Sequence, residues 1–273
     1  MPFRLIVDGP ADGAVNMAVD EALLDSVARG GITTVRFYRF TAPTLTFGYG
    51  QQREQICNET ACRRLGIDRI RRITGGRALL HHDELTYSVT GARPAGSPRT
   101  HYGLVNGAIR NALTNLGVPV DAPGNPSKSS TAASAPNQSS CLSVHTGHEL
   151  TAEGQKLVAS AMRLRRNGFL VHGSILWDVD RTLWKNVFAL PDASTLRAVG
   201  IRELATPDFG EAELIEALTY SFEILFGVRE EHASLTAREV ERVARLEEKY
   251  RSEGWTNRVR RRIHLVDNQK AVW

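Results

Sequence analysis

The sequence predicts a single α/β domain of the α+β type, in which mixed, largely antiparallel sheets are flanked by helices. Several segments carry apolar residues at helical spacing, and short segments rich in β-branched residues lie between them. The two kinds of segment do not alternate regularly, which disfavours a doubly wound parallel sheet. With 273 residues, of which 42% are hydrophobic, the chain is large enough to bury a substantial core.

Four segments have the apolar spacing of an amphipathic helix. The second is expected to end at Gly117 as a C-cap, and the fourth opens with the capping-box pattern from Thr236 to Glu239. The four apolar sets are Val15, Val19, Leu23 and Val27; Leu104, Ala108, Ala112 and Leu116; Leu214, Leu218, Phe222 and Leu225; and Val240, Val243, Leu246 and Tyr250.

Strands are expected at residues 33–39, 44–48, 77–81 and 84–90, where β-branched and aromatic residues are frequent. In the last of these, Leu85, Tyr87 and Val89 alternate with polar residues, which predicts a half-buried strand. Residues 155–163 and 168–177 predict two further strands joined by a charged turn, and therefore a hairpin.

The domain is expected to have a core at about residues 1–230 and a closing C-terminal helical segment at 234–262. Residues 123–140 are rich in Ser, Ala, Pro and Asn, and this composition predicts a mobile loop. No apolar run reaches the ~18–20 residues that span a bilayer, and the first residues lack the regions of a secretory signal. These features predict a cytoplasmic protein that does not associate with membranes.

Three cysteines, Cys57, Cys62 and Cys141, are expected to be free thiols, because their number is odd. Cys57 and Cys62 lie in a segment that predicts a short amphipathic helix with both thiols packed inside. The net charge of +4 is too small to indicate nucleic-acid binding. Arginine clusters at 69–72, 163–166 and 258–262 are interpreted as solvated surface.

Two short motifs have the residue types of a binding site. Gly75 and Gly76 follow Arg72 between two expected strands, and such a pair either forms a simple turn or lets backbone N–H groups approach an anionic ligand. His81 belongs to a His-His-Asp-Glu run, but neighbouring residues on a strand point to opposite faces and do not converge on one metal ion. His81 is therefore expected to line a pocket or to form a structural hydrogen bond.

Cys141 lies where the polar loop ends, and Lys156 follows at the head of an expected strand. A nearby ammonium group favours the thiolate, which is the reactive form of cysteine. Spacing alone leaves open whether the two residues act together or are an ordinary small residue and a surface charge.

Several ordered motifs together resemble the cysteine-dependent octanoyltransferases of the LipM type, within the biotin and lipoate ligase-like superfamily. The longest is RRITGGRALLHHDELTYS at residues 71–88. The resemblance covers nearly the whole chain. The other motifs are GPADGAVNMAVDE at 9–21, Arg36-Phe37-Tyr38, Cys141 and Glu149, GQKLVASA at 154–161, His172-Gly173-Ser174-Ile175, and the closing segment 235–255.

The resemblance implies a catalytic domain that transfers octanoate from acyl carrier protein to the lysine of a lipoyl-domain protein, such as the glycine cleavage H protein or a 2-oxoacid dehydrogenase E2 subunit. Cys141 is the implied nucleophile and Lys156 its partner. No ATP, metal or other cofactor is expected. An acidic carrier is expected to dock on Arg71, Arg72, Arg163 and Arg165. The implied substrate-binding residues are Arg72, Thr74, Gly75, Gly76, Arg77, His81, Ser160, His172 and Gly173.

The chain departs from the family pattern at Ala159, Met162 and His148, and these departures are expected to reshape the acyl pocket. Three alternatives stay open. The first is an amidotransferase that takes octanoate from another lipoyl-domain protein, the second is an ATP-dependent lipoate ligase, and the third is a non-catalytic module that binds lipoyl domains.

Overall fold

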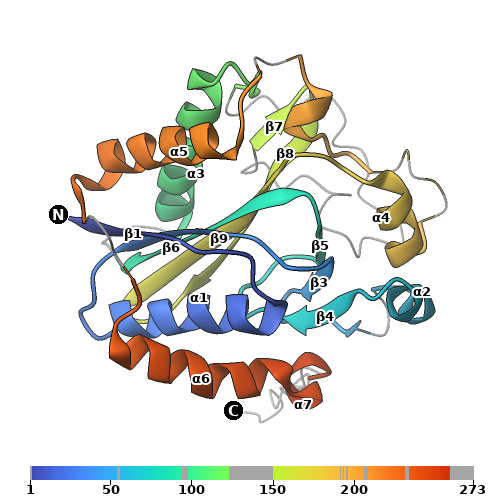
Figure 1. Cartoon of the computed structure of the whole chain (residues 1–273), viewed down its shortest axis with the longest axis horizontal. Coiled ribbons are helices and arrows are strands. Elements are labelled where there is room, and N and C mark those ends of the chain that lie inside the picture. Colours follow the sequence, from blue (N-terminus) through green and yellow to red (C-terminus); the bar gives the residue numbers. More distant parts are fainter. Residues whose placement is uncertain are drawn as a thin grey trace, which may run out of the picture.

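A seven-stranded mixed sheet forms the centre of the protein (Figure 1). The computed structural model describes residues 2–53, 56–93, 98–122, 150–190, 192, 194, 196–205, 208–230 and 234–258. In the strand order β10-β1-β2-β6-β9-β8-β7, the first three strands are parallel and every later pair is antiparallel. The strands are β1 Phe3–Val7, β2 Thr34–Tyr38, β6 Glu84–Ala92, β7 Leu150–Ala152, β8 Gln155–Leu164, β9 Gly168–Leu176 and β10 Arg229–Glu230.

A second sheet of three strands lies beside the first. β3, Thr44–Phe47, is parallel to β4, Asp68–Arg71, and antiparallel to β5, Leu79–His81. The glycine-pair loop that connects β4 to β5 is packed against the end of β3, because a Cβ added to Gly48 would lie 2.0 Å from the carbonyl oxygen of Gly76. Only glycine permits this approach, which fixes the loop against the end of β3 in the smaller sheet.

Helices cover both faces of the larger sheet in layers (Figure 1). α3, Pro98–Asn115, and α5, Glu211–Phe226, lie on one face, and α1, Gly13–Val27, lies on the other. α6, Ala237–Arg251, packs outside α1 as a further layer, and α7, Glu253–Thr256, follows it. α2, Glu59–Arg64, and α4, Arg181–Phe188, contact each other near the smaller sheet.

The predicted helices and strands are confirmed where the structure describes them. The Thr236 side chain accepts from the backbone N–H of Glu239, and the Glu239 carboxylate accepts from that of Thr236, which is the predicted capping box. Gly117 has a φ of +81° just after α3, as its C-cap role requires. β8 and β9 form the predicted hairpin. β1, β4, β7, β10 and α4 were not predicted.

Three details of the sequence interpretation are wrong. β6 is buried on both faces, because α1 covers the face that was expected to be solvated. Leu104 is 49% exposed, and α3 packs through Val105 and Ile109 instead. Cys57 precedes α2 and is partly exposed, whereas Cys62 is buried as predicted.

The loop at 123–140 lies outside the described residues, as does the part of the C-terminal segment beyond 258. Within the part of the chain that the structure describes, every helix is too short or too polar to cross a lipid bilayer.

Candidate functional site

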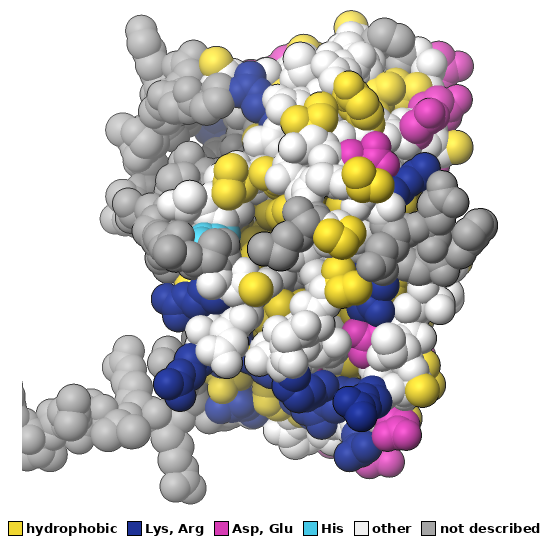
Figure 2. Space-filling view, turned by 90° about the vertical axis from the view of Figure 1, so that its left-hand side faces the viewer, with side chains coloured by type: hydrophobic (Ala, Val, Ile, Leu, Met, Phe, Trp, Pro, Cys, Tyr) yellow, Lys and Arg dark blue, Asp and Glu magenta, His cyan; other side chains and the backbone are white. Residues whose placement is uncertain are grey.

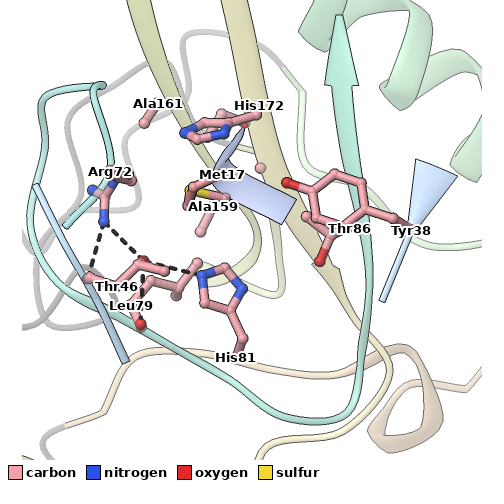
Figure 3. Close-up of a pocket in the computed structure, with 12 residues that line it drawn as sticks. Met17, Tyr38, Thr46, Arg72, Leu79, His81, Thr86, Ala159, Ala161 and His172 are labelled. Atoms are coloured by element: carbon pink, nitrogen blue, oxygen red, sulfur yellow. Dashed lines mark hydrogen bonds between the residues drawn. The ribbon is translucent and has the colours of Figure 1, made fainter. Parts of the chain in front are cut away.

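A pocket lies between the larger sheet, the smaller sheet and α1 (Figure 3). β8 and β9 supply one wall, β3, β5 and Arg72 supply another, and Met17 of α1 closes a third side. Its volume is about 30 Å³, which is room for about two water molecules. The lining residues are Met17, Tyr38, Thr46, Arg72, Leu79, His81, Thr86, Ala159, Ser160, Ala161, His172 and Gly173.

Arg72 joins the pocket wall to the glycine-pair loop. Its guanidinium donates to the carbonyl oxygens of Gly75 and Arg77 at 2.9 and 2.6 Å, and to the hydroxyls of Thr74 and Thr46 at 3.0 Å each. The Arg72 side chain is buried, so these bonds are protected from competition with water. Arg72 therefore fixes the position of the loop rather than presenting a solvated charge.

A first chain of hydrogen bonds leads from α1 to this loop. His172 Nδ1 lies 2.9 Å from Asp20 Oδ2, and His172 Nε2 lies 2.7 Å from the Thr74 hydroxyl. Burial lowers the pKa of His172, although the hydrogen bond to Asp20 opposes this effect. Burial opposes ionisation of Asp20, but the hydrogen bond from His172 and the charge of Arg36 hold the pKa of Asp20 below its usual value. Near neutral pH, therefore, the imidazole is neutral and the carboxylate is charged.

A second chain of the same residue types reaches Arg72 through the smaller sheet. The Nδ1 of His81 contacts Glu84, and the Nε2 of His81 lies 3.0 Å from the hydroxyl of Thr46 (Figure 3). The hydroxyls of Thr86 and Ser174 each donate to Glu84 Oε1 at 2.8 Å. Two carboxylate–histidine–threonine chains thus converge on one guanidinium.

Further buried polar groups bind Asp20, the carboxylate of the first chain. Arg36 is 1% exposed and donates to Asp20 at 3.1 Å and to Asp8 at 2.6 Å. The hydroxyl of Tyr38 donates to the other oxygen of Asp20 at 2.9 Å. Because an ion pair without water is stable only when its remaining hydrogen bonds are satisfied, this cluster fixes α1 against β2.

The structure brings five of the nine predicted substrate-binding residues to the pocket lining: Arg72, His81, Ser160, His172 and Gly173. Thr74, Gly75, Gly76 and Arg77 lie just behind Arg72 and bond to it or contact it. The Ser160 hydroxyl lies 2.6 Å from that of Tyr87, and a Cβ on Gly173 would meet the Ala159 carbonyl at 2.3 Å. Gly173 is therefore required by the close approach of β8 and β9.

Cys141 lies outside the described residues, as do His148 and Glu149. Lys156 is fully buried on β8, three residues before the pocket-lining Ala159, and its backbone bonds to Arg197 and Val199. The alternative that Lys156 is a surface charge is therefore wrong.

Arg71 and Arg72 do not form a docking surface, and the prediction that they do is wrong. Arg71 is 0% exposed and donates to the carbonyl oxygens of Gly48, Gln51 and Thr256. It therefore ties the loop after β3 to the C-terminal α7. The described residues contain no cluster of three or more His, Cys, Asp or Glu side chains arranged to hold a metal ion.

Sequence reasoning missed the polar residues that lie opposite the predicted ones. Thr46 and Thr86 line the pocket, and Asp20 orients His172, yet none of them was assigned a role, although Asp20 and Thr86 lie within the motifs at 9–21 and 71–88. The alternation of Thr86, Ser88 and Thr90 was a signal for this buried polar face, but it was interpreted as solvent exposure.

Comparison with known proteins finds relatives over almost the whole chain. Residues 12–223 match the family model of the lipoyl protein ligase A/B catalytic domain. Octanoyltransferase LipM of Kyrpidia tusciae is 33% identical, with 94% of this chain and 98% of the relative covered. Octanoyltransferase LipM of Geobacillus kaustophilus is 35% identical, with 93% and 97% covered.

Solved structures show the same fold. Lipoate-protein ligase A bound with ATP has a TM-score of 0.80 at 24% identity, with 94% of this chain and 99% of that chain covered. The bi-partite lipoate protein ligase of Thermoplasma acidophilum has a TM-score of 0.79 at 22% identity, with 96% and 99% covered. From the family model and the full-length relatives, this chain belongs to the lipoyl protein ligase A/B catalytic domain family, among the LipM octanoyltransferases.

Proposed function

We propose that this protein is an octanoyltransferase of lipoate biosynthesis that moves octanoate from acyl carrier protein to a lysine of a lipoyl-domain protein through a thioester on Cys141. The observation that carries the proposal is the full-length match to LipM octanoyltransferases, in a chain that also has the buried pocket described above. No ATP or metal takes part in the proposed reaction.

The chemistry has two steps. The thiolate of Cys141 attacks the octanoyl thioester and releases the thiol of the carrier, which exchanges one thioester for another. The amine of the acceptor lysine then attacks, and formation of the more stable amide drives the second step. In this proposal, Lys156 stabilises the thiolate, because a nearby positive charge favours ionisation of a thiol.

The pocket is the proposed site of the octanoyl chain. Leu79, Ala159 and Ala161 give it apolar walls, and Met17 contributes an unbranched, flexible side chain. An octanoyl chain is larger than the 30 Å³ cavity. Binding is therefore proposed to displace Met17, whose three rotatable bonds allow it to repack without moving the backbone of α1.

An arginine surface beside the β8–β9 turn is the proposed docking site for the acidic carrier. Arg165 and Arg242 both bind Asp25, which brings the turn next to α1 and α6, and Arg166 is exposed there. Figure 2 shows Lys and Arg side chains gathered along the lower part of one face of the molecule. Arg165 is four residues beyond the pocket-lining Ala161 on the same hairpin, or about 13 Å at ~3.3 Å per residue.

The lipoyl-domain acceptor is proposed to be the glycine cleavage H protein or an E2 subunit. Mixing the protein with octanoyl carrier protein, without ATP or metal, should give a hydroxylamine-sensitive octanoyl adduct on Cys141 and none on Cys57 or Cys62. Cys62 is buried, and the hydrogen bond with Cys62 and burial raise the pKa of Cys57. Peptide mass spectrometry locates the adduct.

The Cys141→Ala variant should form no adduct and should transfer no octanoate. The matched Cys57→Ala variant should form the adduct on Cys141 and transfer it to the acceptor. Retained transfer in Cys141→Ala, or a requirement for ATP, would refute the proposal in favour of a lipoate ligase. An adduct that forms only from an octanoylated lipoyl-domain protein would identify an amidotransferase. Binding of the acceptor that survives thiol alkylation, with no transfer by the untreated protein, would identify a binding module.

A further inference from the structure

Trp255 lies where the C-terminal segment meets the smaller sheet. It belongs to α7, which contacts β4 (Figure 1). Its ring centroid is 6.0 Å from that of Tyr49 and 5.9 Å from that of Tyr250, and the ammonium of Lys249 lies 3.9 Å from it. The indole N–H donates to the backbone carbonyl oxygen of Arg71 at 2.7 Å. Because an indole has only this one donor, the bond fixes the orientation of Trp255 against the end of β4.

The side chain of Arg71 binds α7 in return. Its Nε and Nη2 donate to the carbonyl oxygen of Thr256 at 3.1 and 2.9 Å. Its Nη1 donates to the carbonyl oxygens of Gly48 and Gln51 at 2.9 and 2.8 Å. Arg71 is 0% exposed, so water does not compete for these bonds. The end of β4 and α7 are therefore joined by hydrogen bonds in both directions.

This junction leads directly to the wall of the pocket. The carbonyl of Arg71 and the N–H of Arg72 belong to one peptide group, which is planar and rigid. Trp255 holds the carbonyl side of this group, and the carbonyl oxygen of Phe47 accepts from its N–H at 3.0 Å. The side chain of Arg72 lines the pocket and binds the carbonyl oxygens of the glycine-pair loop. A shift of Trp255 therefore moves Arg72.

A second route runs through Tyr49. Its ring contacts that of Trp255, and its backbone N–H donates to the carbonyl oxygen of Thr74 at 2.8 Å. Thr74 precedes the glycine pair and also binds the guanidinium of Arg72. The C-terminal segment thus reaches the glycine-pair loop both through the backbone of β4 and through the loop after β3.

A polar cleft of about 310 Å³ separates the earlier part of β4 from the C-terminal segment. Asp68, Arg69 and Ile70 line it on one side, and Tyr250, Glu253 and Thr256 line it on the other. The contact of α7 with β4 is therefore concentrated at the end of the strand, beyond the cleft. A change at this contact should loosen the loop locally and leave the larger sheet folded.

We infer that Trp255 and Arg71 are positioning residues of the acyl site, which hold Arg72 and the glycine-pair loop in place for the octanoyl donor. The inference rests on the proposed octanoyl transfer. The match to the family model ends at residue 223, so α7 lies outside it. A segment beyond the family's catalytic domain thus supports the wall of the pocket.

The test compares Trp255→Phe with the matched control Trp177→Phe. Both substitutions remove an indole N–H and keep an aromatic ring, but the buried N–H of Trp177 has no hydrogen-bond partner among the described residues. Formation of the thioester adduct is followed by rapid quench and mass spectrometry at increasing concentrations of octanoyl carrier protein. Amide hydrogen exchange is measured in the same proteins without the donor.

Trp255→Phe should raise the half-saturating concentration of the donor about 10-fold, the effect of losing one hydrogen bond. The maximal rate should change less than about twofold, because the proposed chemistry belongs to Cys141 and Lys156 in other segments of the chain. The backbone N–H groups of Tyr49 and Arg72 should exchange about 10-fold faster, while those of β6 and β9 keep their rates.

Trp177→Phe should leave the half-saturating concentration and the exchange of Tyr49 and Arg72 as in the wild type. Arg71→Lys replaces the planar fork by a point charge and should reproduce the pattern of Trp255→Phe. It provides a second variant if Trp255→Phe folds poorly.

A folded Trp255→Phe variant with wild-type half-saturation and wild-type exchange at Tyr49 and Arg72 would overturn the inference while leaving the proposed function intact. Exchange that rises equally in β6 and β9 would show that Trp255 only stabilises the fold, and would overturn it as well. If the wild type forms no adduct, the proposed function fails, and exchange at Tyr49 and Arg72 still decides whether Trp255 positions the loop.

Discussion

The two faces of strand β6 have the same burial but opposite chemistry. Leu85, Tyr87 and Val89 point into the apolar core beneath α3 and α5, whereas Thr86, Ser88 and Thr90 occupy the face covered by α1. All six residues are at most 2% exposed. An alternation that normally separates the core from solvent here separates the core from a buried polar face, where Thr86 lines the pocket.

The difference between the faces also extends to the outer layers. α5 packs through Leu214, Leu218 and Phe222, while α6 is joined to α1 by ion pairs as well as apolar contacts. Lys249 and the hydroxyl of Tyr250 both bind Glu21 of α1. The stability of the apolar face therefore comes from the apolar surface that it buries. The stability of the polar face depends on buried charges that have ion-pair and hydrogen-bond partners.

Among the variants that compare the two faces, removal of Arg36 should cause the largest loss of stability. Arg36→Met leaves Asp20 buried without its cation, which we expect to cost about 3–5 kcal/mol of the free energy of unfolding. On the opposite face, Ile175→Val should cost only about 1 kcal/mol. Urea unfolding at pH 7 measures both.

The double variant Arg36→Met/Asp20→Asn should recover part of that loss, since it removes both charges. A cost for Arg36→Met no larger than that for Ile175→Val would show that the polar face does not depend on its ion pairs.

Protonation of Glu239, the carboxylate at the start of α6, should cause a smaller loss of stability than the removal of Arg36. Burial opposes ionisation of Glu239, but hydrogen bonds from Arg4 and the Thr236 backbone lower its pKa to about 2. A carboxylate whose pKa is depressed by folding stabilises the protein above its unfolded pKa of ~4.3. That stability is lost as the pH falls from there toward 2.

Glu239→Gln should therefore destabilise the protein by about 2–3 kcal/mol at pH 7 and progressively less as the pH falls below 4. The exposed Glu241→Gln variant is the control and should have no effect at either pH. Urea unfolding at pH 7 and pH 3 provides the measurement. An equal cost of Glu239→Gln at both pH values would contradict the pKa assignment.

The smallest change in stability is expected for substitutions of two threonines that lie on the same face of β6. The Thr86 hydroxyl donates to Glu84 at 2.8 Å, whereas the buried Thr90 hydroxyl has no hydrogen-bond partner among the described residues. Thr86→Val should cost about 1–2 kcal/mol, and Thr90→Val should be neutral or slightly stabilising. Urea unfolding of the two variants provides the measurement, and a larger cost for Thr90→Val would reverse the assignment.

The sequence was a good guide to elements whose determinants are local. The spacing of Val19 and Leu23 predicted α1, and the pair Thr236 and Glu239 marked the start of α6. β4 was missed because its sequence, Asp68–Arg71, is mostly charged, and the burial of Arg71 depends on carbonyl groups from three distant residues. No local pattern encodes such partners.

In the candidate site, too, residues with local sequence signals were found and residues whose partners are distant in the chain were missed. His81 and Gly76 were found because they belong to a contiguous motif. Asp20 also lies in a contiguous motif, at 9–21, but it was given no role there, because the residue that it orients, His172, lies 152 positions away in the chain. Thr46 and Thr74 acquire their roles only where two separate sheets meet at Arg72.

By itself, the sequence determined the fold class, most helices and strands, the family and the proposed nucleophile, because these depend on periodicity, caps and contiguous motifs. Only the tertiary structure decided that the polar face of β6 is buried, that Arg71 and Arg72 are internal supports, and that two carboxylate–histidine–threonine chains meet at one guanidinium. The physical reason is that burial and hydrogen-bond partners are set by which layer covers a residue. α1 and the smaller sheet come to their positions only when the whole chain has folded.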